Sequence, residues 1–514
     1  MARSASMVLT ASGQTMEKLS MEKRHFLSQF SLTIIGILAT LISFSQPPTV
    51  EWERIFGGDS TDIAYSVQQT FDGGYIYAGE TKSFWSFYKD ALVVRTDSMG
   101  FVDWYHLYGG TGTEIAYSVL QTTDGNFIVA GFTTSFGAGS GDMHLAKLDG
   151  VGDTLWARTY GGPHVDRAHA AELTDDGGLI LGGITRDSSE VDGIYLVRID
   201  SEGDTLWTRA YVSSHDINIW SIQQTYDGGF VLAGDIEINL FSDYDYFLAK
   251  TDSMGDTLWT RTYGGPNEDF GRSVQQTNDA GYIVAGTTWS FGAGYADVYL
   301  VKTDSGGDTL WTRTYGGISS ESAYSVLVTP EGDYVTAGST SSSTENADLY
   351  LIKTDAEGDT LWTLIYGGQD IEYAYSLAPT DDGSYVVAGA YEIFEPPYYY
   401  WVDCLLVKTG PDTSSTHAPS IEWVSHPKDF VLHPAYPNPF NPVTTISFDV
   451  PFQSKISMNM YNVLGQRVAV LMDGNVTPGA HQVQWDASDS PSGIYFVSMN
   501  AGELVQLRKV VLLK

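Results

Sequence analysis

The sequence contains one cysteine, few basic residues and no hydrophobic period of the helical kind between its strand-like segments. Because Cys404 is the single cysteine, the chain cannot form an internal disulfide and must rely on packing for its stability. Asp and Glu number 63 and Lys and Arg number 27, which gives a formal net charge of -36 at pH 7. Binding to nucleic acid requires clustered cationic side chains that displace counterions, so this composition excludes a nucleic-acid partner. The chain has instead 54 Gly and 13% aromatic residues, which indicates a β-rich globular protein with many turns.

The first 45 residues have the pattern of a secretory signal peptide. Basic residues precede the apolar run Leu32–Phe44, and Ser43 and Ser45 are small residues that a signal peptidase accepts. The run is shorter than the roughly 20 residues that a membrane-spanning helix needs, although a membrane anchor stays the alternative. We therefore expect residues 1–45 to act in export, with 1–15 as an extension upstream of the true start.

The body of the chain repeats every 51 or 52 residues. Tryptophan recurs in this period at Trp52, Trp104, Trp156, Trp207, Trp259, Trp311 and Trp362. Glycine keeps the same period at Gly79, Gly131, Gly183, Gly234, Gly286, Gly338 and Gly389. One unit holds four strand-like segments, at 272–277, 282–287, 297–304 and 309–315, joined within each pair by Gly-containing turns. Each unit is therefore expected to be a four-stranded meander.

Four-stranded repeats of about fifty residues have the size of propeller blades. The pattern resembles the kelch class of blade, although most units have Ala-Gly where that class has Gly-Gly. The sequence thus predicts an all-β protein with a seven-bladed β-propeller over residues 46–410. The segment around Trp52 is a fourth strand with no three strands before it, and the last unit lacks its tryptophan. We expect the N-terminal strand to close the ring, with Trp423 as the rival for that position.

Residues 411–432 have the composition of a linker, and an ordered set of motifs follows. The set consists of Tyr436, Pro437, Asn438, Pro439, Phe440, Asn441, Pro442, Gly465, Gly493, Lys509 and Lys514. Through these motifs, residues 433–514 closely resemble the C-terminal sorting domain of type IX secretion substrates. The resemblance implies a small Ig-like β-sandwich, recognition by an outer-membrane translocon and a sortase-like processing enzyme, and a secreted or outer-membrane-surface location in a Gram-negative bacterium. The alternative is an adhesive Ig-like domain that stays attached.

Binding groups of a propeller lie on its loops, and the second-to-third connections vary most between the units. These connections carry the aromatic residues Trp85, Trp289, Tyr399 and Trp401. Because strand direction alternates, they are expected on the same face as the segments that enter each innermost strand. That face is the candidate binding face.

The entering segments of six units carry an acid three residues before a Tyr-like position: Asp62, Glu114, Asp166, Asp269, Glu321 and Glu372. If these acids line a channel, their repulsion favours a divalent cation or a cationic partner, whereas acids that accept hydrogen bonds from turns are structural. Units three to five replace the consensus Tyr by His169, Trp220 and Arg272. We predict a ligand site at these three residues with Asp166 and Asp269, where aromatic rings stack on a sugar or peptide.

The leading hypothesis is a monomeric, non-catalytic, secreted or surface protein that binds an unknown carbohydrate or protein. The sequence has no Ser-His-Asp elbow, HExxH motif, Cys-His pair or phosphate-binding loop. A glycan-processing hydrolase or lyase that uses the six acids is the alternative, and a structural surface-layer protein is the third reading. No cofactor is expected; the turn Asp252–Asp256 and its copies supply oxygen atoms of the kind that bind calcium, but a hairpin accounts for the same residues.

Overall fold

The structure is a computed structural model. It describes residues 46–84, 87–186, 191–239, 243–341, 346–395, 399–413, 430–433, 435, 437–450, 454–476, 479–488, 490–501 and 504–514. All regular secondary structure in this part of the chain is β-strand, and no helix in it is long and apolar enough to cross a membrane. The predicted signal peptide, residues 1–45, lies outside the described residues.

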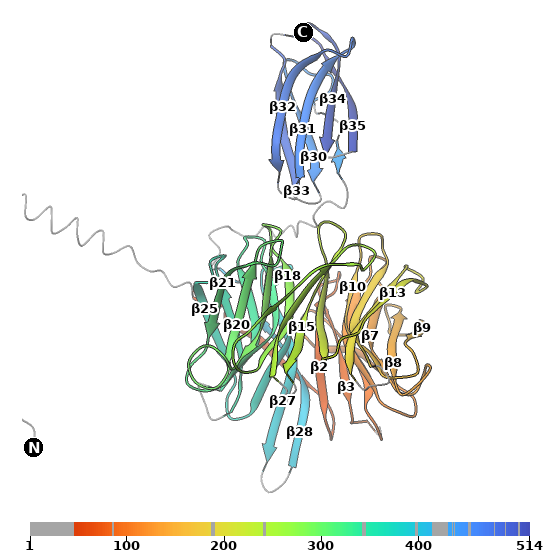
Figure 1. Cartoon of the computed structure of the whole chain (residues 1–514), viewed down its shortest axis with the longest axis vertical. Helices are drawn as coiled ribbons and strands as arrows, with labels where there is room; N and C mark the ends of the chain where they lie inside the picture. Colours follow the sequence, from red (N-terminus) through yellow and green to blue (C-terminus); the bar gives the residue numbers. More distant parts are fainter. Residues whose placement is uncertain are drawn as a thin grey trace, which may run out of the picture. The chain divides into compact units, whose positions relative to one another are not determined.

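The repeat region forms seven four-stranded antiparallel sheets, which we number in chain order (Figure 1). Sheet 1 consists of β2 (Asp62–Gln69), β3 (Tyr75–Thr81), β4 (Asp90–Thr96) and β5 (Val102–Tyr108). Sheet 2 consists of β6 (Glu114–Gln121), β7 (Phe127–Thr133), β8 (Asp142–Leu148) and β9 (Thr154–Tyr160). Sheet 3 consists of β10 (Asp166–Leu173), β11 (Leu179–Arg186), β12 (Asp192–Ile199) and β13 (Thr205–Tyr211). Sheet 4 consists of β14 (Ile217–Gln224), β15 (Phe230–Asn239), β16 (Asp243–Thr251) and β17 (Thr257–Tyr263).

The last three sheets follow the same plan. Sheet 5 consists of β18 (Asp269–Gln276), β19 (Tyr282–Thr288), β20 (Asp297–Thr303) and β21 (Thr309–Tyr315). Sheet 6 consists of β22 (Glu321–Val328), β23 (Tyr334–Thr340), β24 (Asp348–Thr354) and β25 (Thr360–Tyr366). Sheet 7 consists of β26 (Ile371–Pro379), β27 (Tyr385–Glu395), β28 (Tyr399–Thr409) and, as its fourth strand, β1 (Val50–Phe56).

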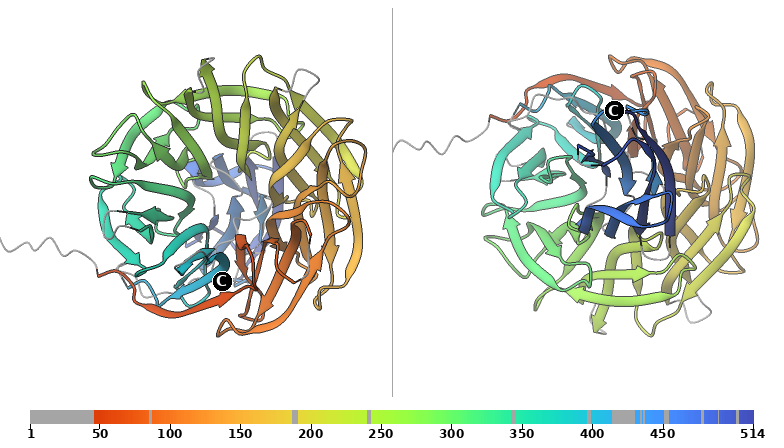
Figure 2. Two further views of the ribbon diagram at one scale, coloured as in Figure 1. Left: turned by 90° about the horizontal axis from the view of Figure 1, so that it is seen from below. Right: turned by 90° about the horizontal axis from the view of Figure 1, so that it is seen from above.

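The two ends of the repeat region meet. β1 pairs with β28, with Trp52 opposite Lys408, so the strand that carries Trp52 completes the last sheet. Sheet 1 packs on sheet 7: the Val67 N–H donates to Ser376 Oγ at 3.1 Å, and residues of both sheets share one core cluster. Figure 2 shows the sheets following one another around a ring. The rival residue, Trp423, lies outside the described residues.

One residue of every innermost strand is skipped in the pairing with the second strand. The skipped residues are Tyr65, Tyr117, His169, Trp220, Arg272, Tyr324 and Tyr375. Such a β-bulge changes the direction of a side chain. It also brings backbones close together, because a Cβ on Gly79 would stand 1.7 Å from the Ile63 carbonyl oxygen. The repeated glycine is therefore a steric requirement of the bulge.

The repeated tryptophan joins neighbouring sheets at their outer edge. A Cβ on Gly307, where φ is +79°, would lie 2.7 Å from the Trp259 ring, so tryptophan packs on a glycine turn of the next sheet. The Tyr263 hydroxyl donates to the Gly307 carbonyl oxygen at 2.6 Å. The same Tyr-to-Gly hydrogen bond recurs for Tyr108, Tyr160, Tyr211 and Tyr315. The tryptophan period thus marks a contact between neighbouring sheets, whereas the repeated glycine of the bulge, such as Gly286, marks a close approach within one sheet.

The structure corrects one predicted strand boundary. The innermost strand of sheet 5 begins at Asp269, three residues before the predicted segment 272–277, whereas the other three strands agree to within one residue. The acid three residues before the Tyr-like position is therefore the first residue of a strand in that sheet and does not lie in the entering loop.

The C-terminal segment forms two further antiparallel sheets around a separate core. One contains β29 (Val431–Leu432), β30 (Val443–Val450) and β33 (Gly479–Asp486). The other contains β32 (Arg467–Val476), β31 (Ser454–Asn462), β34 (Gly493–Ala501) and β35 (Leu504–Leu512). The predicted inward-facing residues are all buried in one core cluster: Ile446, Phe448, Val450, Ile456, Met458 and Met460. The predicted alternation of these two strands is confirmed.

The C-terminal motifs hold the last strand. The Asn438 side chain accepts a hydrogen bond from Val511 N at 2.8 Å and donates to the Lys509 carbonyl oxygen at 3.0 Å. Phe440 is 2% exposed, and its N–H donates to the Val511 carbonyl oxygen at 3.0 Å. Gly465 has φ of +75° in the turn after β31, and Gly493 begins β34. Tyr436 lies outside the described residues.

Candidate functional site

The seven bulged side chains form a girdle around the inside of the ring of sheets. Ring centroids are 5.4 Å apart for Tyr65 and Tyr117, 5.8 Å for Tyr65 and Tyr375, and 5.0 Å for Tyr324 and Tyr375. The girdle continues from Tyr117 to His169 at 5.3 Å. The Tyr-like positions therefore face one another, as the repeat suggested.

The three exceptions to the Tyr consensus contact one another in order. The His169 ring stacks on Trp220 with centroids 4.3 Å apart and 14° between the planes. His169 Nδ1 lies 2.8 Å from the Ile219 carbonyl oxygen, so it donates there. Burial, assisted by the positive charges of two nearby arginines, lowers the pKa of His169 to about 4, which leaves the ring neutral at pH 7. The pair is a flat, uncharged aromatic stack.

A cation lies on the other face of the indole. The Arg272 guanidinium carbon is 4.7 Å from the Trp220 ring centre and 5.3 Å from that of Phe270, so the guanidinium lies against two aromatic faces. Trp220 Nε1 donates to Asp235 Oδ1 at 2.7 Å, and Arg272 Nη1 is 3.6 Å from the same oxygen. The Asp235 side chain is 3% exposed and that of Arg272 is 25% exposed. Asp235 thus orients the Trp220 indole and balances the charge of Arg272. The Arg272 side chain itself keeps contact with solvent.

Asp235 is the residue that the sequence analysis missed. Burial raises its pKa, although Arg272 and hydrogen bonds from Asn218 and Trp220 act in the opposite direction. A weak signal was present, because Asp235 follows Gly234, where five of the six other units hold an apolar or hydroxyl residue: Phe132, Ile184, Thr287, Ser339 and Ala390. The first unit also has an acid there, Glu80, so this departure from the repeat is less specific than that of Trp220.

Aromatic residues connect this cluster to a loop. The Phe270 ring lies edge-on to Trp289 at 5.6 Å and 5.5 Å from Tyr244. Trp289 is 40% exposed, and its N–H donates to the Glu268 carbonyl oxygen, which places the second-to-third loop beside the segment that enters the innermost strand. The predicted sharing of one face is confirmed for this loop. We call His169, Trp220, Arg272, Phe270 and Trp289 the aromatic–arginine cluster.

The other three predicted loop aromatics are Trp85, Tyr399 and Trp401. Trp85 and the side chain of Tyr399 lie outside the described residues. Trp401 lies in β28, paired with Ile393 of β27, in sheet 7. We therefore leave these three out of the proposed binding surface.

The repeated acids have a structural task in the hydrogen bonds that they accept. Asp166 Oδ2 accepts from Gly162 N at 2.7 Å, and Asp269 Oδ2 accepts from Gly265 N at 2.8 Å and from Ser290 Oγ at 2.8 Å. Asp62, Glu114 and Glu321 accept equivalent hydrogen bonds from a glycine N–H. All six acids are buried, between 0% and 4% exposed. These hydrogen bonds favour the turn-stabilising interpretation of the acids, so Asp166 and Asp269 are not included in the aromatic–arginine cluster.

The junction between sheets 3 and 4 departs from the other junctions. Ile217 stands where the six other units have the capping acid, and Val212 stands where a glycine follows the repeated Tyr. An open cavity of ≈ 250 Å³ lies here, lined mainly by apolar side chains that include Ile194, Leu232 and Phe247. Ile217 lies on the same strand as Trp220. The cavity and the His169–Trp220 stack therefore belong to one specialised junction.

A second inward-facing layer carries hydrogen bonds from sheet to sheet. Gln68 Oε1 accepts from Gln121 N at 2.7 Å, and Gln275 Oε1 accepts from Val328 N at 2.7 Å. Sheet 3 has Glu172 at this position, and its Oε2 accepts from Gln224 N at 2.7 Å. Burial raises the pKa of Glu172 to about 8, so it is protonated at pH 7 and substitutes for a glutamine. We assign it a structural role.

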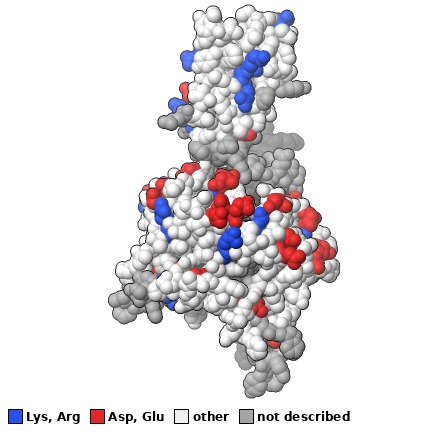
Figure 3. Space-filling model, turned by 90° about the vertical axis from the view of Figure 1, so that its right-hand side faces the viewer, with Lys and Arg blue, Asp and Glu red and all other residues white. Residues whose placement is uncertain are grey.

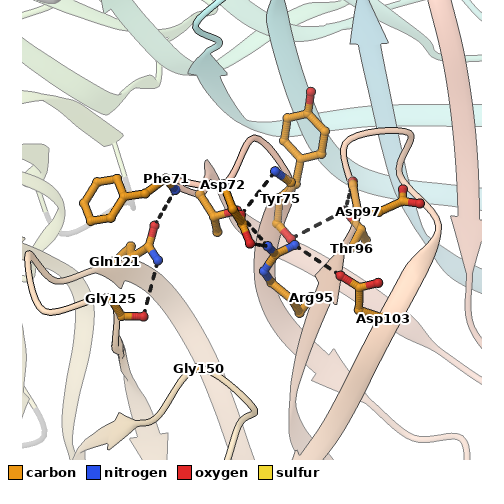
Figure 4. A network of polar contacts seen from close by, with 12 residues as sticks. Phe71, Asp72, Tyr75, Arg95, Thr96, Asp97, Asp103, Gln121, Gly125 and Gly150 are labelled. Atoms are coloured by element: carbon orange, nitrogen blue, oxygen red, sulfur yellow. Dashed lines mark hydrogen bonds and ion pairs between the residues drawn. The ribbon is translucent and has the colours of Figure 1, made fainter.

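The opposite ends of the sheets are tied by ion pairs that the sequence analysis did not predict. Arg95 Nη2 lies 2.5 Å from Asp72 Oδ1, and its Nη1 lies 3.6 Å from Asp103 Oδ2 (Figure 4). A basic residue at the matching position of each third strand pairs with an acid: Lys147, Arg198, Lys250, Lys302, Lys353 and Lys408. Acids outnumber these cations, and Figure 3 shows acidic side chains gathered on the repeat sheets.

The Asp-rich turns are hairpin caps. Asp252 Oδ1 accepts from Met254 N and from Asp256 N, both at 2.9 Å, which fixes the turn without an ion. Within the described ranges, no group of three His, Cys, Asp or Glu side chains is placed to hold a metal.

Comparison with known proteins supports the assignment of the tail. Residues 434–513 match the family model described as "Secretion system C-terminal sorting domain". A segment of 159 residues is 26% identical to the regulatory protein FlaEY of Caulobacter vibrioides; it covers 26% of this chain and 17% of that protein's length. This chain therefore spans only a small part of that relative.

Solved structures give weaker similarities. PorZ, a surface component of the type IX secretion system of Porphyromonas gingivalis, aligns over 89% of this chain and 60% of its own, with 12% identity and a TM-score of 0.40. Sqt1 from Chaetomium thermophilum aligns over 67% of this chain and 87% of its own, with 10% identity and a TM-score of 0.41. Both TM-scores are low, so neither similarity assigns a fold or a function. The sorting domain itself implies a secreted or cell-surface protein that interacts with the type IX secretion machinery.

Proposed function

We propose that residues 46–410 form a closed, seven-bladed β-propeller that binds a carbohydrate outside the cell through the aromatic–arginine cluster, without catalysis. The pairing of β1 with β28 and the packing of sheet 1 on sheet 7 support closure of the ring. The C-terminal domain, which we propose to be Ig-like, delivers the protein through the type IX route to the outer-membrane surface or the medium. A signal peptide in residues 1–45 directs the first, inner-membrane step.

The observation that carries the binding proposal is the Arg272 guanidinium between Trp220 and Phe270, 4.7 and 5.3 Å from their ring centres. The indole of Trp289, which is 40% exposed, supplies a flat face that stacks on the apolar face of a pyranose, and the Arg272 guanidinium donates to the hydroxyl or carboxylate oxygens of the sugar. The Trp220 orientation is fixed in advance by Asp235 at 2.7 Å, which lowers the entropy lost on binding.

The distribution of acids favours binding over hydrolysis. A glycoside hydrolase needs two carboxyl groups in one cleft, about 5 to 10 Å apart and free to exchange protons with substrate. The six repeated acids are buried, and Asp62, Glu114, Asp166, Asp269 and Glu321 each accept a hydrogen bond from a glycine N–H in their own turn. Their regular placement serves the fold of each sheet, so we propose no catalytic role for them.

The test is binding of the full chain to a panel of soluble polysaccharides, followed by calorimetry on any ligand found. Arg272→Ala should weaken binding at least tenfold, whereas Arg261→Ala should leave it unchanged. Arg261 is the matched control because it lies 5.6 Å from the Trp259 ring on an outer strand. Equal binding by wild type and Arg272→Ala would refute the site, and binding of peptides alone would transfer the proposal to a protein ligand.

The export proposal has its own test. In a bacterium with a type IX system, the full chain should reach the medium or cell surface, and a chain that ends at residue 433 should accumulate in the periplasm. Periplasmic accumulation of both chains would refute the proposed route. The monomeric state and processing by a sortase-like enzyme are proposed on the family resemblance, and light scattering and the mass of the mature protein test them.

A further inference from the structure

Six of the seven junctions between neighbouring sheets bring two carboxyl groups together at one glycine. At the junction of sheets 7 and 1, a Cβ on Gly57 would stand 2.0 Å from Asp403 Oδ1 and 2.8 Å from Asp62 Oδ2. At the junction of sheets 4 and 5, a Cβ on Gly264 would stand 2.0 Å from Asp245 Oδ1 and 2.8 Å from Asp269 Oδ2. The other pairs are Asp90 with Glu114, Asp142 with Asp166, Asp297 with Glu321, and Asp348 with Glu372. One acid of each pair lies on a third strand, and the other is the first or second residue of the next innermost strand.

In two of these pairs, Asp403 with Asp62 and Asp245 with Asp269, both acids have a buried oxygen that accepts no hydrogen bond from a described residue. Asp62 and Asp269 are 0% exposed. One buried oxygen of each acid, Oδ1 of Asp62, Asp403, Asp245 and Asp269, accepts no hydrogen bond from a described residue. No Lys, Arg or His of the described residues forms an ion pair with any of the four. Burying two adjacent carboxylates in this state is unfavourable, because the site removes water and supplies no positive charge.

The exceptional junction shows the other way to satisfy an acid. Asp192 begins the third strand of sheet 3, and its carboxylate is held by Arg186 through bonds of 2.7 and 2.9 Å. The position that matches Asp245 is Gly193, which pairs with Thr185 as Asp245 pairs with Ile236, and the facing position holds Ile217. Both acids of the pair are therefore absent at this junction and the neighbouring Asp192 has an arginine, whereas in the two junctions described above both acids are present and no cation of the described residues accompanies them.

We propose that Asp403 with Asp62, and Asp245 with Asp269, each share one proton, which is bound when neighbouring sheets pack and is lost as the pH rises. The proton resides on the third-strand acid, whose O–H donates to the carboxylate across the junction. Each pair then carries one negative charge in place of two, and one unpartnered oxygen becomes a donor. This inference concerns stability and stands independently of the proposed ligand site.

The groups around the two pairs reinforce proton binding. Near Asp403 and Asp62 lie Cys404, Tyr77 and Glu80, and burial raises the pKa values of Cys404 and Tyr77, which stay neutral. Around Asp245 and Asp269 lie Asp243 and the neutral Tyr246 and Tyr299, with Arg272 acting on Tyr246. Burial and the facing acid raise the pKa of Asp403 to about 6 and that of Asp245 to about 6, from an ordinary value of 3.8.

These raised pKa values fix the sign of the effect. Between pH 3.8 and about 6 the folded protein keeps protons that the unfolded chain has lost. The stability from the shared protons is therefore complete below the ordinary pKa and falls as the pH rises through about 6.

The test compares the full chain with Asp245→Asn/Asp403→Asn by thermal unfolding between pH 4 and pH 8. Asparagine donates a hydrogen bond at every pH, so the variant should lose the decline in Tm between pH 5 and pH 7 and should unfold at least a few degrees above wild type at pH 8. Asp192→Asn is the control, and it should lower Tm at pH 8 because it weakens the Arg186 ion pair.

Two results would overturn the proposal. One is an Asp245→Asn/Asp403→Asn variant whose Tm at pH 8 drops as it does in Asp192→Asn. The other is a rise in wild-type Tm on addition of 5 mM calcium chloride at pH 8 that the variant lacks, since the pair would then hold a cation in place of a proton. Proton release on unfolding, measured from the buffer dependence of the unfolding enthalpy at pH 5, should be smaller in the variant by about two protons.

Discussion

Removal of the Asp412 carboxylate should destabilise the ring of sheets more than removal of any exposed ion pair. Asp412 lies just after the seventh sheet, in the predicted linker, yet its side chain is 4% exposed and its Oδ2 is 2.8 Å from Lys353 Nζ. Lys353 is 2% exposed, and its other acidic neighbour, Asp333, is farther away at 3.3 Å. Tyr385 OH and Trp362 Nε1 also donate to Asp412, at 3.1 and 3.3 Å.

Asp412→Ala leaves the buried Lys353 ammonium with Asp333 as its acidic neighbour among the described residues, and loss of a partner from a buried pair costs about 3 to 5 kcal/mol. Because Asp333 keeps part of the compensation, we expect about 3 kcal/mol, together with loss of the Tyr385 and Trp362 hydrogen bonds. Urea unfolding followed by tryptophan fluorescence measures the change in the free energy of unfolding.

Asp308→Ala is the matched control for this prediction. Arg261 Nη2 and Asp308 Oδ1 are 3.1 Å apart, but the side chains are 37% and 75% exposed, so the control should cost less than about 1 kcal/mol. Equal effects of the two substitutions would show that burial of Lys353 does not determine the value of its ion pair.

Three further predictions concern single positions. Ala280 has φ of +62°, and Gly228 occupies the matching hairpin position in the preceding unit. Ala280→Gly should therefore raise the free energy of unfolding by about 1 kcal/mol, and Gly228→Ala should lower it by a similar amount. Urea midpoints measure both changes. Glu172 has a raised pKa of about 8, so wild type loses stability as the pH rises through that value; Glu172→Gln should remove the loss, seen as equal Tm values at pH 7 and pH 9. Asp235→Ala leaves the Trp220 and Asn218 N–H groups without their acceptor and should cost about 1 to 3 kcal/mol, together with a change in near-UV circular dichroism.

The period of the chain predicts local structure well, because each unit encodes its own strands and turns. The four strands of sheet 5 follow from apolar runs and Gly-containing turns, and three of them have the predicted bounds to within one residue. The partner of β1 was also predictable by counting strands. The first tryptophan segment is a fourth strand with no sheet of its own, and the last repeat lacks its fourth strand, so the two were expected to pair.

Contacts between units were harder to predict because the period does not state which residues of neighbouring units meet. Asp403 and Asp62 are 341 positions apart in sequence and become neighbours only when the ring of sheets forms. Trp220, as a departure from the repeat, indicated the site, whereas Asp235 beneath it needed the pairing of β14 with β15 to place its carboxylate at the indole N–H. The sequence left open whether the repeated acids line a channel or stabilise turns, because their glycine donors follow from the turn geometry.

As the pH rises, some acids of this protein increase the stability of the fold and others decrease it. We therefore predict that the Tm has its maximum in moderately acidic solution. Burial alone would raise the pKa of Asp382, but hydrogen bonds from Lys408, Thr380 and Ser384 lower it to about 2. Stability from this pair is complete above the ordinary value of 3.8 and is lost as the pH falls through about 2. Lys302 and a hydrogen bond from Thr277 likewise lower the pKa of Asp279 against the effect of burial.

Ionisation of the junction acids lowers the stability of the fold at the high end of the pH range. Burial, followed by the charge of Asp348, raises the pKa of Glu372 to about 7, and Asp403 and Asp245 titrate at about 6. Wild-type Tm should therefore be highest between pH 4 and pH 5 and fall on both sides. Asp245→Asn/Asp403→Asn should shift the maximum upward, whereas Asp382→Asn should reduce only the acid-side decline. A Tm that rises steadily from pH 4 to pH 8 would mean that the hairpin ion pairs dominate and that the junction acids are ionised in the folded protein.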